Sequence, residues 1–550
     1  MSSETNSFEA TENTRPADTA NVAADTRPAD NANMADPASA RVIGTETEFG
    51  VIDAANPGAN PVVLSAQAVE TYAAAIANGE IVRWDYSGED PLNDARGYRL
   101  ERASAHPSML TDDPYRLAPS GGVEYEERPG EYERFMQRAT SVVLPNGGRF
   151  YVDHAHPEYS SPETTDPLTA VLYDRAGDRL AVHAMREARA DGLDLVLYKN
   201  NTDGKGASYG THENYQVPRE VDFDDLVRVL IPFFVTRPII CGSGRVGLGQ
   251  RGERAGFQIS QRADFVENEV GLETTFNRPI INTRDEPHAF RDKYRRLHVI
   301  NGDANQFDVS TYLRVGTTSL VLRALEGELD LSWEGLALDQ DPVKTAWLVS
   351  HDVDMRMKID LKSGRSVTAI ELQRMFLELV RENVELTEAD QRLVSTWERV
   401  LHGLENDLAS VASDVEWVGK YLLFERQRER LQSTWDDPRL AAMDLQWADL
   451  RPEKSLVAAL DRAGRVTRLF DQQAVEDAVH NPPAGTRAHI RGLAISIIPQ
   501  VVKASWTSIV VDQPEHLVRI PLPEPGDEGS AAALQAIEAA DADQLIRLFT

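Results

Sequence analysis

Polar and apolar residues alternate along the stretch that begins at Arg149 and predict a β-strand with two different faces. In a strand, Arg149, Tyr151 and Asp153 share one face, while Phe150 and Val152 point to the other. Burying polar and charged groups on a sheet face costs free energy unless those groups bind something. We therefore interpret this polar face as part of a binding or catalytic site.

Three further segments alternate in the same way, and each offers a polar strand face. They carry the pairs Glu46 and Glu48, His212 and Asn214, and Arg296 and His298. Two carboxylates spaced two residues apart repel each other, and a multivalent cation relieves that repulsion. Each pair alone is also consistent with solvated or hydrogen-bonded strand residues, but four such faces in one chain favour a shared site.

The residue types on these faces indicate metal-dependent chemistry. Glu158, which follows the Arg149 strand, adds another carboxylate to the set. Carboxylates with one or two imidazoles suit Mg²⁺ or Mn²⁺, whereas a zinc site more usually shows Cys or a compact His motif. The added arginines favour a metal-bound nucleotide. Asp153 is then the candidate nucleophile or general base.

Periodicity also predicts the other elements of the chain. We expect helices over 65–77 with Ser65 as the N-cap, and over 167–190, 224–234, 311–328, 366–382, 386–410, 415–432 and 531–548. Further strands are expected over 194–198, 257–264 and 504–511. The sequence leaves open whether the last helix packs on the body or binds a partner.

Changes in composition predict the domain organisation. Residues 1–40 have almost no large apolar side chains, which predicts a disordered tail. A catalytic domain is expected over 41–435, interrupted by a polar insertion over 84–137. A small C-terminal domain over 436–522 and an acidic tail with a short helix over 523–550 complete the chain.

Charge and cysteine content narrow the class of partner and compartment. The net charge of −31 argues against nucleic acid and membrane surfaces as general partners. No apolar run approaches the roughly 20 residues that a membrane-spanning helix needs. The single cysteine, Cys241, lies in an apolar stretch, excludes an intrachain disulfide and fits a reducing, cytoplasmic location.

Four motifs resemble those of one enzyme family. They are Gly44–Gly50, Tyr151–Tyr159, Tyr209–Tyr215 and Asn481–Arg487. Together they are similar to the Pup ligase/depupylase family, whose members attach or remove the prokaryotic ubiquitin-like protein Pup. The family is related to glutamine synthetase and the glutamate–cysteine ligases. The resemblance covers residues 41–522 and leaves out the tail.

This resemblance implies an α+β fold, with a glutamine-synthetase-like curved antiparallel sheet backed by helices and a small C-terminal domain. It implies ATP and Mg²⁺ at one end of the sheet and the C-terminal residue of Pup at the other. The metal ligands implied are Glu46, Tyr151 and Glu158, with Glu48, His212 and His298 as further candidates. Arg149, Ser161 and Trp506 are implied ATP contacts, and Arg262 a phosphate contact. The family has Thr at the position of Ser161, so the hydroxyl group is kept.

Three features resemble the hydrolase branch of the family: the insertion over 84–137, the His154-Ala-His156 spelling and the segment 203–209. The insertion departs from the branch by extra material near Pro119–Glu133. The implied activity in the Pup–proteasome system is hydrolysis of the isopeptide bond between the C-terminal Glu of Pup and lysines of pupylated proteins. Deamidation of a C-terminal Gln of Pup is also implied, with ATP as a cofactor and Asp153 as the catalytic residue.

Three alternatives stay open at this point: an ATP-dependent Pup–protein ligase, a small-molecule ligase of the glutamate–cysteine type, and a non-enzymatic Pup-binding protein with a decayed site.

Overall fold

The structure is a computed structural model that describes residues 41–549, except 78–80, 107–108, 111–121, 129–139, 204–207, 248–254, 287–290, 328–332, 334 and 524–527. The chain divides into two units, residues 1–33 and 34–550, and every described residue belongs to the second unit. The predicted tail over 1–40 and most of the extra material near Pro119–Glu133 therefore lie outside the described residues.

One large sheet carries all the predicted polar faces. It has eleven strands in the order β14 (Tyr294–Val299), β9 (Thr211–Pro218), β1 (Ile43–Glu48), β7 (His156–Ser160), β6 (Arg149–Asp153), β5 (Ser141–Val143), β3 (Arg83–Trp84), β17 (Val501–Ala504), β18 (Ser508–Asp512), β19 (Leu517–Pro521) and β4 (Glu124–Glu126). Neighbouring strands are antiparallel, except that β3 and β17 run parallel. The predicted α+β class, with a largely antiparallel sheet backed by helices, is confirmed.

Smaller strand pairs surround this sheet. They are β2 (Gly50–Asp53) with β8 (Leu195–Tyr198), β10 (Arg245–Gly247) with β11 (Gly256–Gln258), β12 (Asn268–Gly271) with β13 (Pro279–Asn282), and β15 (Ile359–Asp360) with β16 (Ser366–Val367). The strand predicted over 194–198 is therefore present as β8.

Strands β6 and β7 form a tight hairpin, which sets the geometry of the polar face. Asp153 pairs with His156, so the turn contains only two residues. Its first residue, His154, adopts the left-handed conformation with φ of 51°, the backbone geometry that short hairpin turns require. The hairpin places Tyr151 directly opposite Glu158, and side chains paired in this way project from the same face of a sheet.

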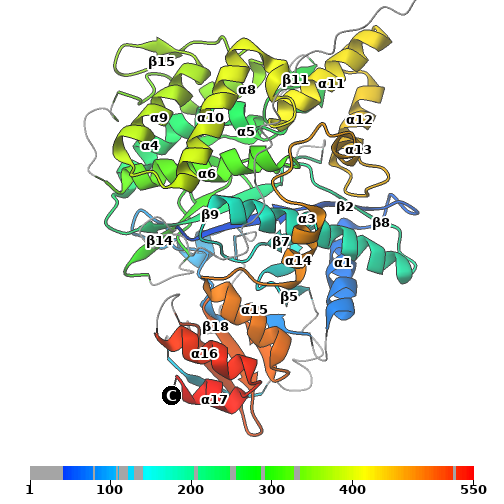
Figure 1. The fold of residues 1–550 in the computed structure, drawn as a ribbon, viewed down its shortest axis with the longest axis vertical. Helices are drawn as coiled ribbons and strands as arrows, with labels where there is room; N and C mark the ends of the chain where they lie inside the picture. Colours follow the sequence, from blue (N-terminus) through cyan, green and yellow to red (C-terminus); the bar gives the residue numbers. More distant parts are fainter. Residues whose placement is uncertain are drawn as a thin grey trace, which may run out of the picture. The chain divides into compact units, whose positions relative to one another are not determined.

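Two helices cover the other face of the central strands (Figure 1). They are α1 (Pro61–Ile76) and α3 (Pro167–Ala190), which pack on each other and on these strands. Phe150 and Tyr159, from β6 and β7, are buried under the two helices. Gly177 of α3 permits the close approach, because a Cβ atom there would lie 2.3 Å from the Tyr159 ring.

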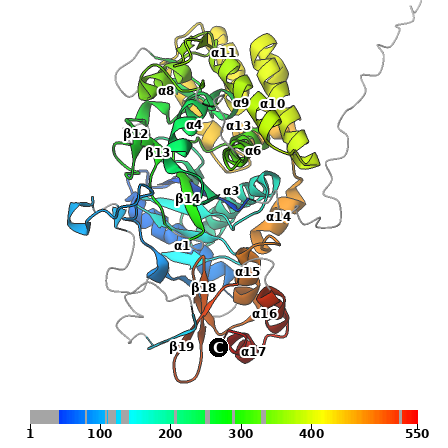
Figure 2. The ribbon, with the colours of Figure 1, turned by 90° about the vertical axis from the view of Figure 1, so that its left-hand side faces the viewer.

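A group of helices forms the largest core, and Figure 2 shows α6, α9 and α10 side by side within it. Its members are α4 (Phe223–Thr236), α5 (Pro238–Cys241), α6 (Asp308–Leu325), α8 (Pro342–His351), α9 (Ala369–Asn383), α10 (Glu388–Asn406) and α11 (Glu416–Leu431). Five of these helices confirm predictions made from periodicity, although their ends shift by a few residues. Among the described residues, no helix is both long enough and apolar enough to span a bilayer.

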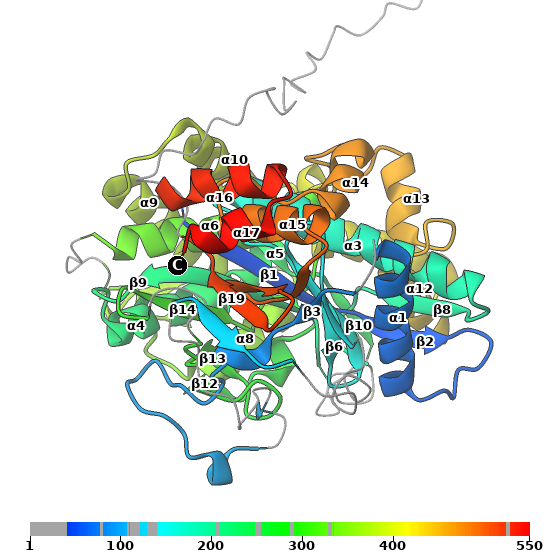
Figure 3. The same ribbon diagram turned by 90° about the horizontal axis from the view of Figure 1, so that it is seen from below.

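The last fifth of the chain, from α12 onward, contributes both helices and the far strands of the sheet. Its helices are α12 (Pro438–Ala448), α13 (Leu456–Arg462), α14 (Gln472–His480), α15 (Arg487–Ile497), α16 (Glu528–Glu538) and α17 (Ala542–Arg547). Helix α14 packs on α3, and Figure 3 shows α15, α16 and α17 lying together beside β19. The boundaries proposed for a separate C-terminal domain stay a prediction.

The prediction of one terminal helix is wrong in detail. Helices α16 and α17 are separated at Ala540, which adopts a left-handed φ of 52°. Ala533, Ile537 and Leu545 are buried in a cluster with residues of α15 and β17–β19. The two helices therefore pack on the body of the protein.

The insertion over 84–137 begins in the sheet and returns to its edge. Strand β3 lies between β5 and β17, and the returning strand β4 pairs with β19. Arg519 of β19 is buried between two carboxylates of the insertion, those of Asp85 and Glu126. These contacts fix both described ends of the insertion on the sheet.

Three predicted ends of helices and strands are wrong, because side chains form hydrogen bonds with backbone groups at those positions. Helix α1 begins at Pro61 with Asn60 as its cap, and the Ser65 hydroxyl instead donates to the carbonyl oxygens of Pro61 and Ala155. The strand predicted over 257–264 stops early, because the Ser260 hydroxyl accepts from the next two available amides, those of Arg262 and Ala263. The strand predicted over 504–511 breaks at Ser505–Thr507, where the Ser505 hydroxyl accepts from the amide of Thr507.

Candidate active site

The strand registers bring the four predicted polar faces together on one side of the sheet. Glu46 pairs with Ser160 on one neighbouring strand and with His212 on the other. Glu48 pairs with Glu158, and His298 pairs with Asn214, which is on the same face of β9 as His212. Because directly paired residues project from the same face, β1, β6, β7, β9 and β14 build one continuous polar surface.

The first group of possible metal ligands consists of Glu46, His212 and His298. One ligand atom from each of the three lies within 4.8 Å of the others. The Nδ1 atom of His212 lies 3.2 Å from Glu46 Oε2, and Asn214 donates to Glu46 Oε1 over 3.0 Å. The Nδ1 atom of His298 lies 3.0 Å from Asn214 Oδ1, so Asn214 links the glutamate and the second imidazole.

The electrostatics of this first group suit a cation. Burial alone would raise the pKa of Glu46, but the hydrogen bond with His212 and the charge of Arg296 hold it well below its usual range. Burial lowers the pKa of His298 well below that of a free imidazole. The group therefore combines an ionised carboxylate with a neutral imidazole at His298, which are the forms that bind metal ions.

The second group consists of three carboxylates, those of Glu48, Asp153 and Glu158. One oxygen from each lies within 4.8 Å of the others. Burial raises the pKa of Glu158 well above its usual value, and the charges of Asp153 and Glu48 raise it further. Such crowding is unfavourable without a counter-charge, so a divalent cation fits this donor set.

Glu48 is held ionised within this second group. Burial opposes its charge, but interactions with His156, whose Nδ1 atom lies 3.6 Å from Glu48 Oε1, lower the pKa to about 2. The amide of Gly210 also donates to Glu48 Oε2 over 3.0 Å. Tyr151, opposite Glu158, keeps its proton because burial raises its pKa well above 10.

Arg149 lies at the other end of strand β6, enclosed by aromatic rings. Its guanidinium carbon is 3.9 Å from the ring centre of Tyr151, 4.5 Å from Trp84 and 5.2 Å from Tyr86. Its Nη2 atom donates to the Tyr86 hydroxyl over 3.1 Å, and its Nη1 atom lies 3.4 Å from Glu89 Oε1. Stacking and hydrogen bonds therefore orient this cation toward the site.

Tyr86 and Glu89 are site residues that sequence reasoning missed. Both belong to the insertion over 84–137, whose weak periodicity gives no strand face on which to place them. The aromatic Trp84-Asp85-Tyr86 run was the one local signal for this part of the site. Arg284 and Glu286, which also line the pocket around Arg149, lie outside every predicted element.

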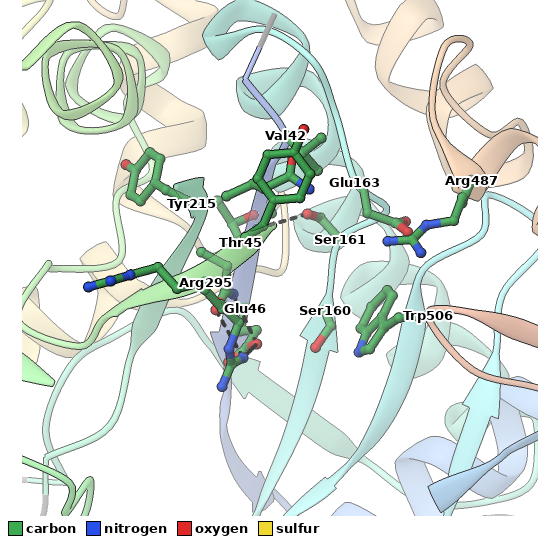
Figure 4. A pocket seen from close by; sticks show the side chains of 15 residues that line it. Val42, Thr45, Glu46, Ser160, Ser161, Glu163, Tyr215, Arg295, Arg487 and Trp506 are labelled. Atoms are coloured by element: carbon green, nitrogen blue, oxygen red, sulfur yellow. Dashed lines mark hydrogen bonds and ion pairs between the residues drawn. The ribbon is translucent and has the colours of Figure 1, made fainter. Parts of the chain in front are cut away.

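Two adjoining pockets open on the polar face. The larger, of about 1010 Å³, contains Arg149, Tyr151, Asp153, Glu158, His212 and His298. The smaller, of about 670 Å³, contains Ser161 and Arg487, and Figure 4 shows Trp506 beside Ser160 at its rim. Glu46, Ser160, Arg296 and Trp506 line both pockets. A ligand that spans the two would contact nearly every predicted site residue.

Ser161 and Trp506 are placed at this site by different parts of the sheet. The Ser161 hydroxyl accepts from the Thr45 amide over 2.9 Å and is buried between β1 and β7. Trp506 lies in the turn between β17 and β18, where its ring packs edge-on against Trp84 at 4.8 Å. With Arg149 stacked on the same Trp84 ring, the structure brings the three predicted nucleotide contacts together.

Arg262 lies outside the residues that line the two pockets. Its Nη1 atom donates to the carbonyl oxygens of Thr211 and Gly302, over 2.7 and 2.9 Å. Burial lowers its pKa to about 9. Its Nε and Nη2 atoms have no hydrogen-bond partner within the part of the chain that the structure describes, so its contact with a phosphate stays a prediction.

This sheet face combines a cluster of three carboxylates, a cluster of one glutamate and two histidines, and an arginine stacked between aromatic rings. Such a set of side chains is suited to a metal ion and a nucleotide. A model of the family described as Pup-ligase protein matches residues 41–510. The chain belongs to this Pup-ligase family.

Similar relatives carry both activities found in the family. The chain is 46% identical to the Pup deamidase/depupylase of Mycolicibacterium smegmatis, over 90% of this chain and 96% of the relative. It is 45% identical to the depupylase of Acidothermus cellulolyticus, over 88% and 94%. It is 40% identical to Pup–protein ligase 2 of Rhodococcus erythropolis, over 64% and 81%.

Two solved structures share the fold. The complex between Pup and its ligase PafA aligns with a TM-score of 0.70 and 29% identity, over 91% of this chain and 92% of that chain. The structure of PafA in complex with ADP aligns with a TM-score of 0.65 and 32% identity, over 80% and 99%.

Proposed function

We propose that this chain cleaves the isopeptide bond between the C-terminal Glu of Pup and lysine side chains of pupylated proteins, and deamidates a C-terminal Gln of Pup to Glu. The carboxylate of Asp153, which lies close to those of Glu48 and Glu158 in an open pocket, carries this proposal. The hydrolase activity, rather than ligation, is supported by 46% identity to a deamidase/depupylase over 90% of the chain. The ligase relatives match only 64% of the chain.

Both reactions hydrolyse a γ-carboxamide. The carbonyl carbon gains an oxygen, its bond to nitrogen breaks, and the leaving lysine amine or ammonia gains a proton. Asp153 serves either by attacking the carbonyl carbon or by taking a proton from the attacking water. His154, whose Nδ1 atom lies 2.9 Å from Asp153 Oδ2, is placed to donate the proton to the leaving nitrogen, because its hydrogen bond with Asp153 raises its pKa.

We infer that Mg²⁺ is the cation of this site. Glu48 and Glu158, with Tyr151 opposite Glu158, would hold one ion, and Glu46, His212 and His298 would hold another. Asp153, which lies beside the first of these ions, is then left for the reaction itself. When bound, the ions supply positive charge that stabilises a developing oxyanion and the phosphates of the nucleotide. All three carboxylates of the second group tolerate ionisation more readily with such a counter-charge.

ATP is the proposed nucleotide, and its contacts follow from the two pockets. Arg149 is oriented toward the larger pocket, while Ser161 and Trp506 lie along the smaller one. The ADP complex of PafA supports a nucleotide in this family. An arginine already stacked between rings loses little side-chain freedom on binding phosphate, so Arg149 is suited to the phosphate end of the ligand.

Glu89 makes nucleotide affinity depend on pH. Burial raises its pKa to about 7, even though the charge of Arg149 opposes that shift. Below this pKa Glu89 is neutral and leaves Arg149 available for phosphate; above it, the ionised carboxylate competes for Arg149 and repels the ligand. Mg-ATP affinity is therefore expected to be about tenfold higher near pH 6 than near pH 8, as measured by calorimetry.

The Glu89→Gln variant provides the control for this pH dependence. Glutamine keeps the size and the hydrogen-bond acceptor for Trp84, whose Nε1 atom donates to Glu89 Oε1 over 2.8 Å, but it cannot ionise. We expect affinity in this variant to be nearly constant over the same range, after the same correction for protonation of ATP itself. An equal pH dependence in both proteins would assign the effect to another group.

The proposed activity is tested with purified protein, a pupylated substrate, ATP and Mg²⁺. Release of free Pup together with unmodified substrate is expected, and Pup ending in Gln should be converted to the form ending in Glu. Accumulation of new conjugates from Pup ending in Glu would identify a ligase instead. Glutamate-dependent formation of ADP without Pup would indicate a small-molecule ligase.

We also infer a cytoplasmic location and a place in the Pup–proteasome system. Cys241 is buried and is the single cysteine of the chain, which suits a reducing compartment. Pupylated proteins as substrates would link this hydrolase to protein degradation, since removal of Pup reverses their tagging. Fractionation of cells followed by immunodetection of the chain tests the location directly.

A further inference from the structure

Two helices on the back of the sheet share a second cluster of possible metal ligands. His183 lies on α3, and Glu476 and His480 lie four residues apart on α14, a spacing that places both on one helix face. One ligand atom from each of the three lies within 4.8 Å of the others. Helix α3 covers the sheet face opposite the active site, so this cluster is separate from the site described above.

The distances in the cluster are close to those of a tetrahedral metal site. The Nε2 atom of His183 lies 3.0 Å from Glu476 Oε1, and the Nε2 atom of His480 lies 3.9 Å from the same oxygen. Ligands about 2.0–2.1 Å from a tetrahedral zinc ion are about 3.3 Å apart. The two imidazole nitrogens lie within 4.8 Å of each other, so closing the cluster on an ion requires the half-exposed His480 side chain to move inward.

His183 has an unused nitrogen that points into this cluster. The residue is only 6% exposed, and its Nε2 atom makes no hydrogen bond within the described part of the chain, despite its closeness to Glu476. Leaving a buried polar atom without a partner is unfavourable. A ligand between the three side chains would satisfy this nitrogen.

Glu476 is held in position for such a ligand. Its Oε2 atom is ion-paired with Arg179 Nε, which lies one turn before His183 on α3. The other oxygen, Oε1, faces the two imidazoles. Partners of this kind, which fix a carboxylate by its second oxygen, are typical of metal sites in proteins.

We propose that His183, Glu476 and His480 bind one divalent transition-metal ion, with Zn²⁺ as the best match. Two imidazole nitrogens and one carboxylate oxygen suit zinc, whereas Mg²⁺ prefers oxygen ligands in an octahedral arrangement. The side chain of His480 is 52% exposed, so the ion reaches the cluster from solvent and takes water as its fourth ligand.

The ion would connect parts of the chain that are almost 300 positions apart in sequence, and its role is structural. His480 is the last residue of α14 and is followed at once by Asn481, whose carbonyl oxygen accepts from the Tyr173 hydroxyl of α3 over 2.8 Å. The segment continues into α15 and then into β17 and the turn that carries Trp506. Fixing α14 on α3 would stabilise the connection to that part of the active site.

The test uses the full-length protein, stripped of metal with a chelator and then saturated with Mg²⁺ to occupy the carboxylate-rich clusters. Titration with Co²⁺, the spectroscopic substitute for zinc, is expected to give the intense visible bands of tetrahedral coordination at one equivalent. Added Zn²⁺ should remove these bands. Zn²⁺ should also raise the unfolding temperature of the stripped protein, because an ion that binds only the folded state stabilises it.

Variants assign the bound ion to this cluster. The His480→Gln change affects a half-exposed side chain, and we expect it to weaken Co²⁺ binding at least about tenfold and to remove the zinc-dependent rise in unfolding temperature. The double change His183→Gln and His480→Gln should abolish the bands. His402→Gln, an exposed histidine of α10, is the matched control and should behave like the unchanged protein.

The outcomes separate this proposal from binding on the active face. In a His298→Gln variant, which disrupts the cluster with Glu46 and His212, the bands should persist. Their loss in that variant, their full retention in His480→Gln, or the absence of tetrahedral bands in the unchanged protein would each overturn the proposal. None of these readouts depends on Pup or on its cleavage, so the result is independent of the proposed function.

Discussion

The Asp153→Asn variant is expected to lose cleavage of pupylated substrate by about 10²–10⁴-fold or more, while its fold and its nucleotide affinity stay close to normal. The amide can neither attack a carbonyl carbon nor accept a proton from water at neutral pH. Folding should change little, because the Asp153 side chain is 29% exposed at the mouth of a hairpin. Release of free Pup, followed over time on gels, measures the effect, and calorimetry with Mg-ATP measures nucleotide affinity.

A matched change elsewhere in the sheet region controls for the loss of one carboxylate. Asp53 ends strand β2, and its Oδ1 atom accepts only a local hydrogen bond, from the Ala55 amide over 2.9 Å. Asp53→Asn should leave the rate of Pup release unchanged. Normal cleavage by the Asp153→Asn variant would remove Asp153 from the mechanism, and an inactive unchanged protein would favour a Pup-binding role instead.

The second large effect concerns stability. Arg237→Met is expected to lower the free energy of unfolding by about 3–5 kcal/mol, because it leaves a buried carboxylate without its partner. The Nη1 and Nη2 atoms of Arg237 donate to the two oxygens of Glu213 over 2.8 and 2.9 Å, and both side chains are at most 2% exposed. Urea unfolding followed by circular dichroism, analysed for the first cooperative transition, provides the measurement.

Two further variants show whether the loss of stability in Arg237→Met comes from the unpaired buried charge of Glu213. Adding Glu213→Gln to Arg237→Met should recover part of the stability, since the uncompensated charge is then gone. Arg381→Met breaks a surface pair with Glu398, whose side chain is 57% exposed, and should cost no more than about 1 kcal/mol. A smaller loss for Arg237→Met than for Arg381→Met would contradict the importance assigned to burial.

Arg237 also matters for the site, because Glu213 lies between His212 and Asn214 on β9. Alternate residues of a strand face opposite sides of the sheet. The Glu213–Arg237 pair therefore fixes β9 from the buried side, while His212 and Asn214 point from the other side into the site. Loss of this anchor is therefore expected to weaken metal binding as well as stability.

The period-two pattern was sufficient to predict the central strands and their polar faces. Glu46 and Glu48 do share one face of β1, and Arg149, Tyr151 and Asp153 share one face of β6. The alternating pattern does not predict the register between strands. That register places Glu48 opposite Glu158 and Glu46 opposite His212. The family resemblance had already named these four residues as possible ligands of one site, but it did not say which of them lie opposite each other in the sheet.

Tertiary contacts and side-chain hydrogen bonds explain why Glu89 was missed and why Trp506, although named as a site residue, was placed in the wrong element. Glu89 reaches Arg149 because β3 enters the sheet between β5 and β17, and no local pattern encodes that neighbourhood. Trp506 was predicted to lie in a strand but occupies a turn, because Ser505 binds the backbone amide that a strand would have used. In both cases long-range or side-chain hydrogen bonds outweighed local preference.

The short strand β4 has a consequence for how far the length of the insertion can change. It covers the outer edge of β19, and the insertion that carries it neutralises Arg519. Removing β4 and its acidic residues would expose the edge of β19 and take away Glu126, one of the two carboxylates that compensate the buried Arg519. An open strand edge and an undercompensated buried cation together favour self-association. A change in length that removes β4 therefore requires matching changes in β19, so the insertion and the C-terminal strands form one structural unit.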